Sequence, residues 1–262
     1  MPDDASPAPP PVAAPGPLVS GGHRLEWHLA RPPSSAARDA TRTGLVVAHG
    51  MPSGPGSGVT ASQTYPELAD RVARETGWAA LSFSFRGAGL SPGQFSPAGW
   101  LEDLTAAVAH LRSEVSTVWL AGFGFGGTLA LRLSAVDPEI GGVAALATPS
   151  DLSPWIADPI ALAAAAHGAG ILDTPAPEGI ETWAADLRAM DPLRSAAAVP
   201  PRPLLIVHGS ADAEVALVEA RALADAAEGQ GDLRVVANAG HRLRHDPRVV
   251  AILLGWLERG EG

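Results

Sequence analysis

The fold of this chain is decided by the stretch VWLAGFGFGGT, residues 118–128. Its first four residues are apolar and predict a buried strand. The glycines that follow predict a sharp turn, and the apolar run that continues to Val136 predicts a helix. A strand, a tight turn and a helix are therefore expected in direct succession, with Gly124 at the centre of the turn.

Short apolar runs alternate with longer helical stretches around this segment, which is typical of βαβ units and a mostly parallel sheet. Residues 44–49, GLVVAH, are apolar without alternation, as expected of a central strand covered on both faces. The fold class is therefore α/β, with a mostly parallel central sheet flanked by helices. We expect further strands at residues 25–30, 79–85, 142–147, 203–207 and 233–237, and helices at 65–76, 96–114, 128–136, 218–227 and 249–259.

The composition narrows the class of protein. Of 262 residues, 46% are apolar, which suffices for the core of one large domain. The 28 acidic and 18 basic residues give a net charge of −10, which opposes binding to nucleic acid or to an anionic membrane surface. No apolar run reaches the roughly 20 residues that span a bilayer. The chain has no cysteine, in keeping with a cytoplasmic protein.

Two segments depart from the alternating pattern. Residues 1–22 begin with a Pro- and Ala-rich run that lacks the features of a secretory signal, so we expect a disordered tail. Residues 23–262 are expected to form a single domain. Between about residues 152 and 200 the strands stop, which predicts a small helical lid insertion over the carboxyl edge of the sheet. Its helices are expected near residues 159–167 and 179–190.

Three candidate site segments follow the ends of expected strands, where α/β folds place their ligand sites. The first is His49-Gly50-Met51. The second is Gly124 with Phe125. The third is the pair Asp212 and His241, whose separation of 29 residues leaves room for a helix and a strand.

The order of these segments resembles that of the α/β-hydrolase superfamily, especially its small esterase-like and peptidase-like members. The resemblance runs from about Gly44 to Glu258. It rests on the segment at His49, on RGAGLS at residues 86–91, on the glycine-rich turn, and on the acid and histidine that follow. It implies an α/β-hydrolase fold.

The resemblance also implies roles for the site residues. His241 would act as general base, and Asp212 would orient it. The backbone N–H groups of Met51 and Phe125 would form an oxyanion hole. The family writes the turn as G-x-S-x-G with a nucleophilic serine at its centre, whereas this chain has Gly124, which has no side chain to attack with. A water bonded to the histidine would then take the nucleophile's place.

Three functions remain open on this basis. The first is hydrolysis of a small ester, amide or related carbonyl compound by the His–Asp pair and water. The second is that of a non-catalytic pseudo-hydrolase that binds a small ligand or a protein partner. The third rests on Gly122, Gly124 and Gly127, which also match the dinucleotide fingerprint G-x-G-x-x-G, with Asp151 24 residues further on. The sequence does not indicate an oligomeric state.

Other polar side chains are weighed as alternatives. His49 is expected to be structural, and Arg86 is expected to pair with a carboxylate such as Asp103. His241 and His245 stand four residues apart, but their loop context predicts no zinc site, so no metal and no cofactor are expected. The remaining candidates are a spare carboxylate and three hydroxyls whose spacing does not place them over the turn: Glu214, Ser53, Ser57 and Ser91.

Overall fold

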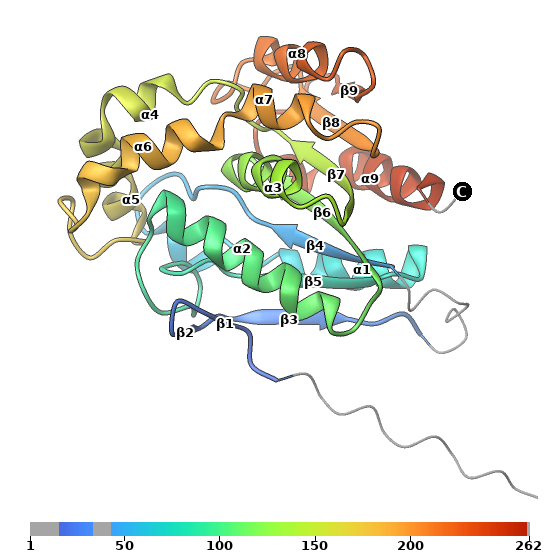
Figure 1. Cartoon of the computed structure of the whole chain (residues 1–262), viewed down its shortest axis with the longest axis horizontal. Helices are drawn as coiled ribbons and strands as arrows, with labels where there is room; N and C mark the ends of the chain where they lie inside the picture. The colour runs from blue at the N-terminus through green and yellow to red at the C-terminus, as the bar shows by residue number, and fades with distance from the viewer. Residues whose placement is uncertain (1–15, 34–42, 261–262) are drawn as a thin grey trace, which may run out of the picture.

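The computed structural model describes residues 16–33 and 43–260. These residues form a mixed sheet with helices on both faces (Figure 1). One edge strand runs antiparallel to its neighbour and the other neighbouring strands are parallel, which confirms the mostly parallel sheet. In order across the sheet, the strands are β3 (Trp27–Ala30), β5 (Ala79–Phe83), β4 (Thr43–Ala48), β6 (Thr117–Phe123), β7 (Ile140–Leu146), β8 (Leu204–Gly209) and β9 (Asp232–Val236).

Helices cover both faces because successive residues of a strand point to opposite sides of the sheet. In β4, Leu45 and Val47 belong to the apolar cluster on one face, whereas Val46 and Ala48 belong to the cluster on the other. All four are buried, as the unbroken apolar run predicts. The first face is covered by α1 (Tyr65–Thr76) and α9 (Pro247–Arg259), and the second by α2 (Pro97–Arg112), α3 (Phe125–Val136) and α8 (Leu217–Ala226).

The stretch between β7 and β8 is helical. In Figure 1 its first helices lie beyond the end of the sheet toward which β4 points. Two of the helices match the expected ones, whereas two short helices were not predicted. Within the described residues, no helix combines the length and apolarity needed to cross a bilayer. The helices are α4 (Ser153–Ala157), α5 (Pro159–Ala169), α6 (Ile180–Met190) and α7 (Pro192–Ala197).

Secondary structure begins before residue 23, where the domain was expected to start. β1 (Val19–Ser20) pairs with β2 (His23–Arg24) in a short antiparallel hairpin. Leu18 is buried at 2% exposure in the core. Residues 18–22, expected as the end of the tail, instead pack against the domain, because Leu18 is buried and Oγ of Ser20 accepts a hydrogen bond from Arg86. Residues 1–15 lie outside the described part.

Candidate active site

The chain turns sharply at Gly124, between the end of β6 and the start of α3. Gly124 has a φ of +52° and a ψ of −124°, a region that residues with a side chain rarely adopt. Its N–H donates to the carbonyl oxygen of Leu146 at 2.8 Å, and its own carbonyl oxygen accepts from the N–H of Gly127 at 3.0 Å. The turn is therefore held from both neighbouring elements, β7 and α3.

Close packing explains the glycines on either side of this position. A Cβ on Gly126 would collide with the carbonyl oxygen of His49, and a Cβ on Gly122 would collide with the carbonyl oxygen of Gly126. At Gly124 a Cβ would have room, because the nearest atom, Nε2 of His241, would lie 3.5 Å away. A side chain at Gly124 would thus fit in space and face the histidine.

His241 and Asp212 form a hydrogen-bonded pair beside the turn. They follow β9 and β8, neighbouring parallel strands whose carboxyl ends meet at one edge of the sheet. Nδ1 of His241 lies 2.9 Å from Oδ2 of Asp212. Because a carboxylate only accepts hydrogen bonds, Nδ1 carries the proton, and Nε2 is left as an acceptor on the side of Gly124.

The Asp212 carboxylate is buried and held in its ionised form. Its Oδ1 accepts the N–H groups of Glu214 and Val215, each at 2.9 Å. Burial raises the pKa of Asp212, but the hydrogen bonds from Val215, His241 and Glu214 outweigh it and lower the pKa overall. Nε2 of the buried His208 lies 3.4 Å from Oδ2 of the same carboxylate. His208 was not among the predicted site residues, although its place at the end of β8 was a usable signal.

The proposed oxyanion donors lie against the same turn. As the first residue of α3, Phe125 has an N–H without an intrahelical acceptor, and neither it nor Met51 donates a backbone hydrogen bond within the described residues. Met51 is close to the turn because the preceding residue, Gly50, packs against it. The Cα of Gly50 lies 3.7 Å from the place of a Cβ on Gly124. Both Met51 and Phe125 line a cavity that Gly124 also lines.

His49 is a structural residue, as expected. Its Nε2 accepts the N–H of Phe85 at 3.1 Å, so Nδ1 carries the proton and donates to the carbonyl oxygen of Gly50 at 2.8 Å. The pKa of His49 is lowered to about 4, mainly because the ring is buried. The neutral ring therefore ties the segment after β5 to the loop that follows β4.

Two cavities share Gly124, His241 and the loop residues Met51, Pro52 and Ser53 in their walls. We call them the smaller cavity, of about 120 Å³, and the larger cavity, of about 620 Å³. They differ in chemistry as well as in size.

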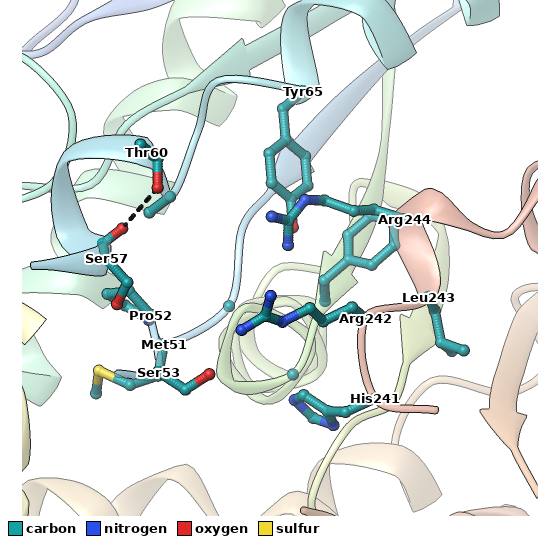
Figure 2. A pocket seen from close by; sticks show the side chains of 14 residues that line it. Met51, Pro52, Ser53, Ser57, Thr60, Tyr65, His241, Arg242, Leu243 and Arg244 are labelled. Carbon is teal, nitrogen blue, oxygen red and sulfur yellow. Dashed lines mark hydrogen bonds between the residues drawn. The ribbon is translucent and has the colours of Figure 1, made fainter. Parts of the chain in front are cut away.

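The smaller cavity is basic (Figure 2). Arg242 and Arg244 line it beside Tyr65, and Figure 2 shows both guanidinium groups pointing into the space. The guanidinium of Arg244 lies 5.5 Å over the Tyr65 ring, and its Nε donates to Oγ1 of Thr64 at 2.9 Å. Burial raises the pKa of Tyr65 to about 12, although the nearby Arg244 opposes this. Tyr65, Arg242 and Arg244 were not among the predicted site residues.

The larger cavity has apolar and acidic walls. Trp155 of α4 and Leu162 of α5 line it together with Phe125, whose ring centroid is 5.3 Å from that of Trp155. Glu214 also lines it, with Oε2 4.0 Å from Nε2 of His241. Glu219 lines it too and accepts backbone N–H groups of the loop after β7.

The other candidates lie in different surroundings. Arg86 forms the expected pair with Asp103, at 2.7 Å between Nη2 and Oδ1. Ser91 is buried away from both cavities and donates to the carbonyl oxygen of Ser84 at 2.7 Å. The carboxylate of Asp151, which a dinucleotide site would use, is bonded to Ser153. Among the described residues, no group of three or more His, Asp or Glu side chains is arranged to hold a metal ion, at His245 or elsewhere.

The sequence profile of the alpha/beta hydrolase family matches residues 45–252. The chain belongs to this family, and its fold agrees with that of the family. A search of curated protein sequences finds no match.

Solved structures of hydrolases share the fold. Est1E from Butyrivibrio proteoclasticus, solved with ferulic acid bound, has a TM-score of 0.63 at 18% identity and covers 93% of this chain and 96% of its own. An α/β serine hydrolase without a lid from Xanthomonas campestris has a TM-score of 0.63 at 23% identity, with 97% and 96% covered. A serine hydrolase homologue from Coxiella burnetii has a TM-score of 0.60 at 19% identity, with 97% and 100% covered.

Proposed function

We propose that this protein hydrolyses a small ester, amide or related carbonyl compound with water as the nucleophile, and that Gly124 occupies the position where the family has its catalytic serine. The observation that carries the proposal is the position of His241. Its Nδ1 is bonded to Asp212, and its Nε2 lies 3.5 Å from the place of a Cβ on Gly124. The proton acceptor is therefore oriented toward the space that a serine side chain would fill.

In the proposed reaction, Nε2 of His241 accepts a proton from a water in that space as the water attacks the carbonyl carbon. Asp212 stabilises the imidazolium that forms, and the imidazolium then donates its proton to the leaving group. The N–H groups of Met51 and Phe125 stabilise the negative charge on the carbonyl oxygen. General-base catalysis of this kind contributes about 10²- to 10⁴-fold to the rate.

The helices between β7 and β8 are proposed to act as a lid. Residues of α4 and α5 line the larger cavity, which has room for the greater part of a small apolar substrate. Proteins of the same fold include a meta-cleavage product hydrolase and an enol-lactonase. Their names support a carbonyl compound as the substrate class.

A panel of activated esters tests this function on the wild type, Gly124→Ser and His241→Ala. We expect slow hydrolysis by the wild type that His241→Ala abolishes. Gly124→Ser is expected to form an acyl-enzyme, because a hydroxyl on that Cβ comes within hydrogen-bond reach of Nε2. Wild-type turnover that is equal to that of His241→Ala would contradict the proposal.

A non-catalytic ligand-binding protein is the second candidate, and the glycine at position 124 favours it. The same panel separates the two functions. A pseudo-hydrolase gives no turnover as the wild type, and it gains activity only as Gly124→Ser.

Ser53 provides the control for a displaced nucleophile, because it is a serine in the wall of both cavities. Ser53→Ala is expected to keep wild-type turnover. A fluorophosphonate probe is expected to leave the wild type unlabelled, and labelling at Ser53 would contradict attack by water.

A further inference from the structure

The smaller cavity carries two positive charges, those of Arg242 and Arg244. Among the residues that the structure describes, no Asp or Glu lines it. Within residues 16–33 and 43–260, neither Arg242 nor Arg244 forms an ion pair with a carboxylate. The smaller cavity is therefore a basic site in a chain of net charge −10.

The local fold holds both side chains at this position. They flank Leu243, which is buried at 1% exposure in the apolar cluster that also contains Tyr65. Leu243 begins the short 3₁₀ turn η3 (Leu243–His245), so its burial orients the arginines on either side of it. Arg244 is further fixed by its bond to Thr64 and by its position over the Tyr65 ring.

The positive field reaches neighbouring groups. Burial lowers the pKa of His245, and the charges of Arg244 and then Arg242 lower it further. The hydroxyl-bearing residues Ser53 and Thr60 stand in the wall of the same cavity, opposite the arginines in Figure 2. The site therefore combines cationic donors with neutral polar groups.

The size of the cavity limits what it can hold. Its volume of about 120 Å³ is about a fifth of the 620 Å³ of the larger cavity, which suits a small polar group rather than an acyl chain. A guanidinium fork matches the two oxygens of a carboxylate. Because Gly124 and His241 also line this cavity, a group bound here lies next to the reacting carbonyl.

We propose that Arg242 and Arg244 bind a carboxylate of the substrate, so that the substrates are small carbonyl compounds that carry a carboxylate close to the bond that is cleaved. The inference rests on the proposed function for the cleaved bond, but the carboxylate site itself is a binding site that can be measured without turnover. The rest of the substrate extends into the larger cavity.

Calorimetric titration with succinamic acid and succinamide tests the site. The two molecules are similar in size and differ by a carboxylate in place of an amide. Because both contain an amide, the titrations are repeated with His241→Ala, which lacks the general base and is expected to hydrolyse neither. Wild type is expected to bind the acid at least about tenfold more tightly than the diamide, as expected for hydrogen bonds to a charged group. Arg242→Gln is expected to lower the affinity for succinamic acid about tenfold and to leave the affinity for succinamide unchanged.

Arg221→Gln is the matched control. Arg221 is an exposed residue of α8 outside both cavities, and its substitution changes the net charge equally. It is expected to keep wild-type affinity. Because Arg242 is exposed as well, its variant is expected to fold, which circular dichroism checks.

Three results would overturn the carboxylate site: no binding of succinamic acid by the wild type, equal binding of the two ligands, or an equal loss of affinity in Arg221→Gln and Arg242→Gln. The proposed function fails separately. Wild type that binds succinamic acid as expected but hydrolyses no ester would contradict hydrolysis and leave the carboxylate site in place.

Discussion

The two cavities that meet at Gly124 and His241 differ in what they offer a ligand. The smaller one has two guanidinium groups in its wall, and neither forms an ion pair with a carboxylate in the described part of the chain. The larger one is about five times as large, 620 against 120 Å³, and combines aromatic side chains with carboxylates. The difference indicates a substrate with two unlike ends, a carboxylate on the side of Arg242 and an apolar part under α4 and α5.

Some residues line both cavities, and others line only one of them. His241 and the loop at Met51 serve both, so their loss is expected to affect every substrate. Arg242 and Trp155 each line one cavity, so their loss is expected to act on one end of the substrate only.

The largest effect is expected for His241→Ala, because it removes the proton acceptor that both cavities share. We expect kcat to fall by about 10²- to 10⁴-fold for methyl hemisuccinate and for an uncharged ester such as methyl butyrate. Steady-state kinetics by pH-stat measures both substrates. A decrease in kcat for only one of the two substrates would contradict a catalytic centre that both cavities share.

The next effect concerns the loop that both cavities share. His49 anchors it, with a pKa of about 4 in the folded protein against 6.5 for an unperturbed histidine. As the pH falls, the unfolded chain takes up a proton on His49 at a higher pH than the folded protein does. The contribution of neutral His49 to the free energy of unfolding is therefore fully present above pH 6.5, and about 3 kcal/mol of it is lost as the pH falls to 4.

Denaturant unfolding of the wild type and His49→Gln between pH 4 and 7.5 measures this. Glutamine can accept the N–H of Phe85 and donate to Gly50, but it does not titrate. The variant is expected to depend less on pH, and equal pH dependence of the two proteins would contradict the assigned role.

A smaller effect is expected for Trp155→Ala, which removes an aromatic side chain from the larger cavity only. The KM of methyl esters with an apolar acyl chain is expected to rise about tenfold, while the affinity for succinamic acid stays unchanged. Ile160→Ala, an exposed position of α5 at 66% exposure, is the control and is expected to change neither value. Equal changes for both ligands would mean that the cavities are not independent.

Much of the fold could be predicted because its signals are local and repeated. Residues 44–49 were expected as a buried strand, and residues 44–48 of this run lie in β4 (Thr43–Ala48). The helix at residues 65–76 was predicted with its observed bounds. The short helices α4 and α7 were missed because helices of 5 and 6 residues leave almost no periodic pattern. β1 and β2 were missed because two-residue strands depend on a partner rather than on composition.

The candidate site could be predicted in part. Asp212 and His241 follow neighbouring parallel strands, so chain order alone brings them to one edge of the sheet. Arg242 and Arg244 could not be foreseen, because the direction of their side chains depends on the burial of Leu243. That burial is a tertiary contact, which an alternating pattern does not indicate.

The central claim is that water, activated by His241, attacks the substrate in place of a serine. Intact-mass spectrometry of the wild type during steady-state hydrolysis of an activated ester, with Gly124→Ser measured in parallel, tests it most directly. We predict continuing product formation with unmodified protein mass in the wild type, and an acyl adduct at residue 124 in the variant. An acyl adduct on a native serine of the wild type would contradict the account.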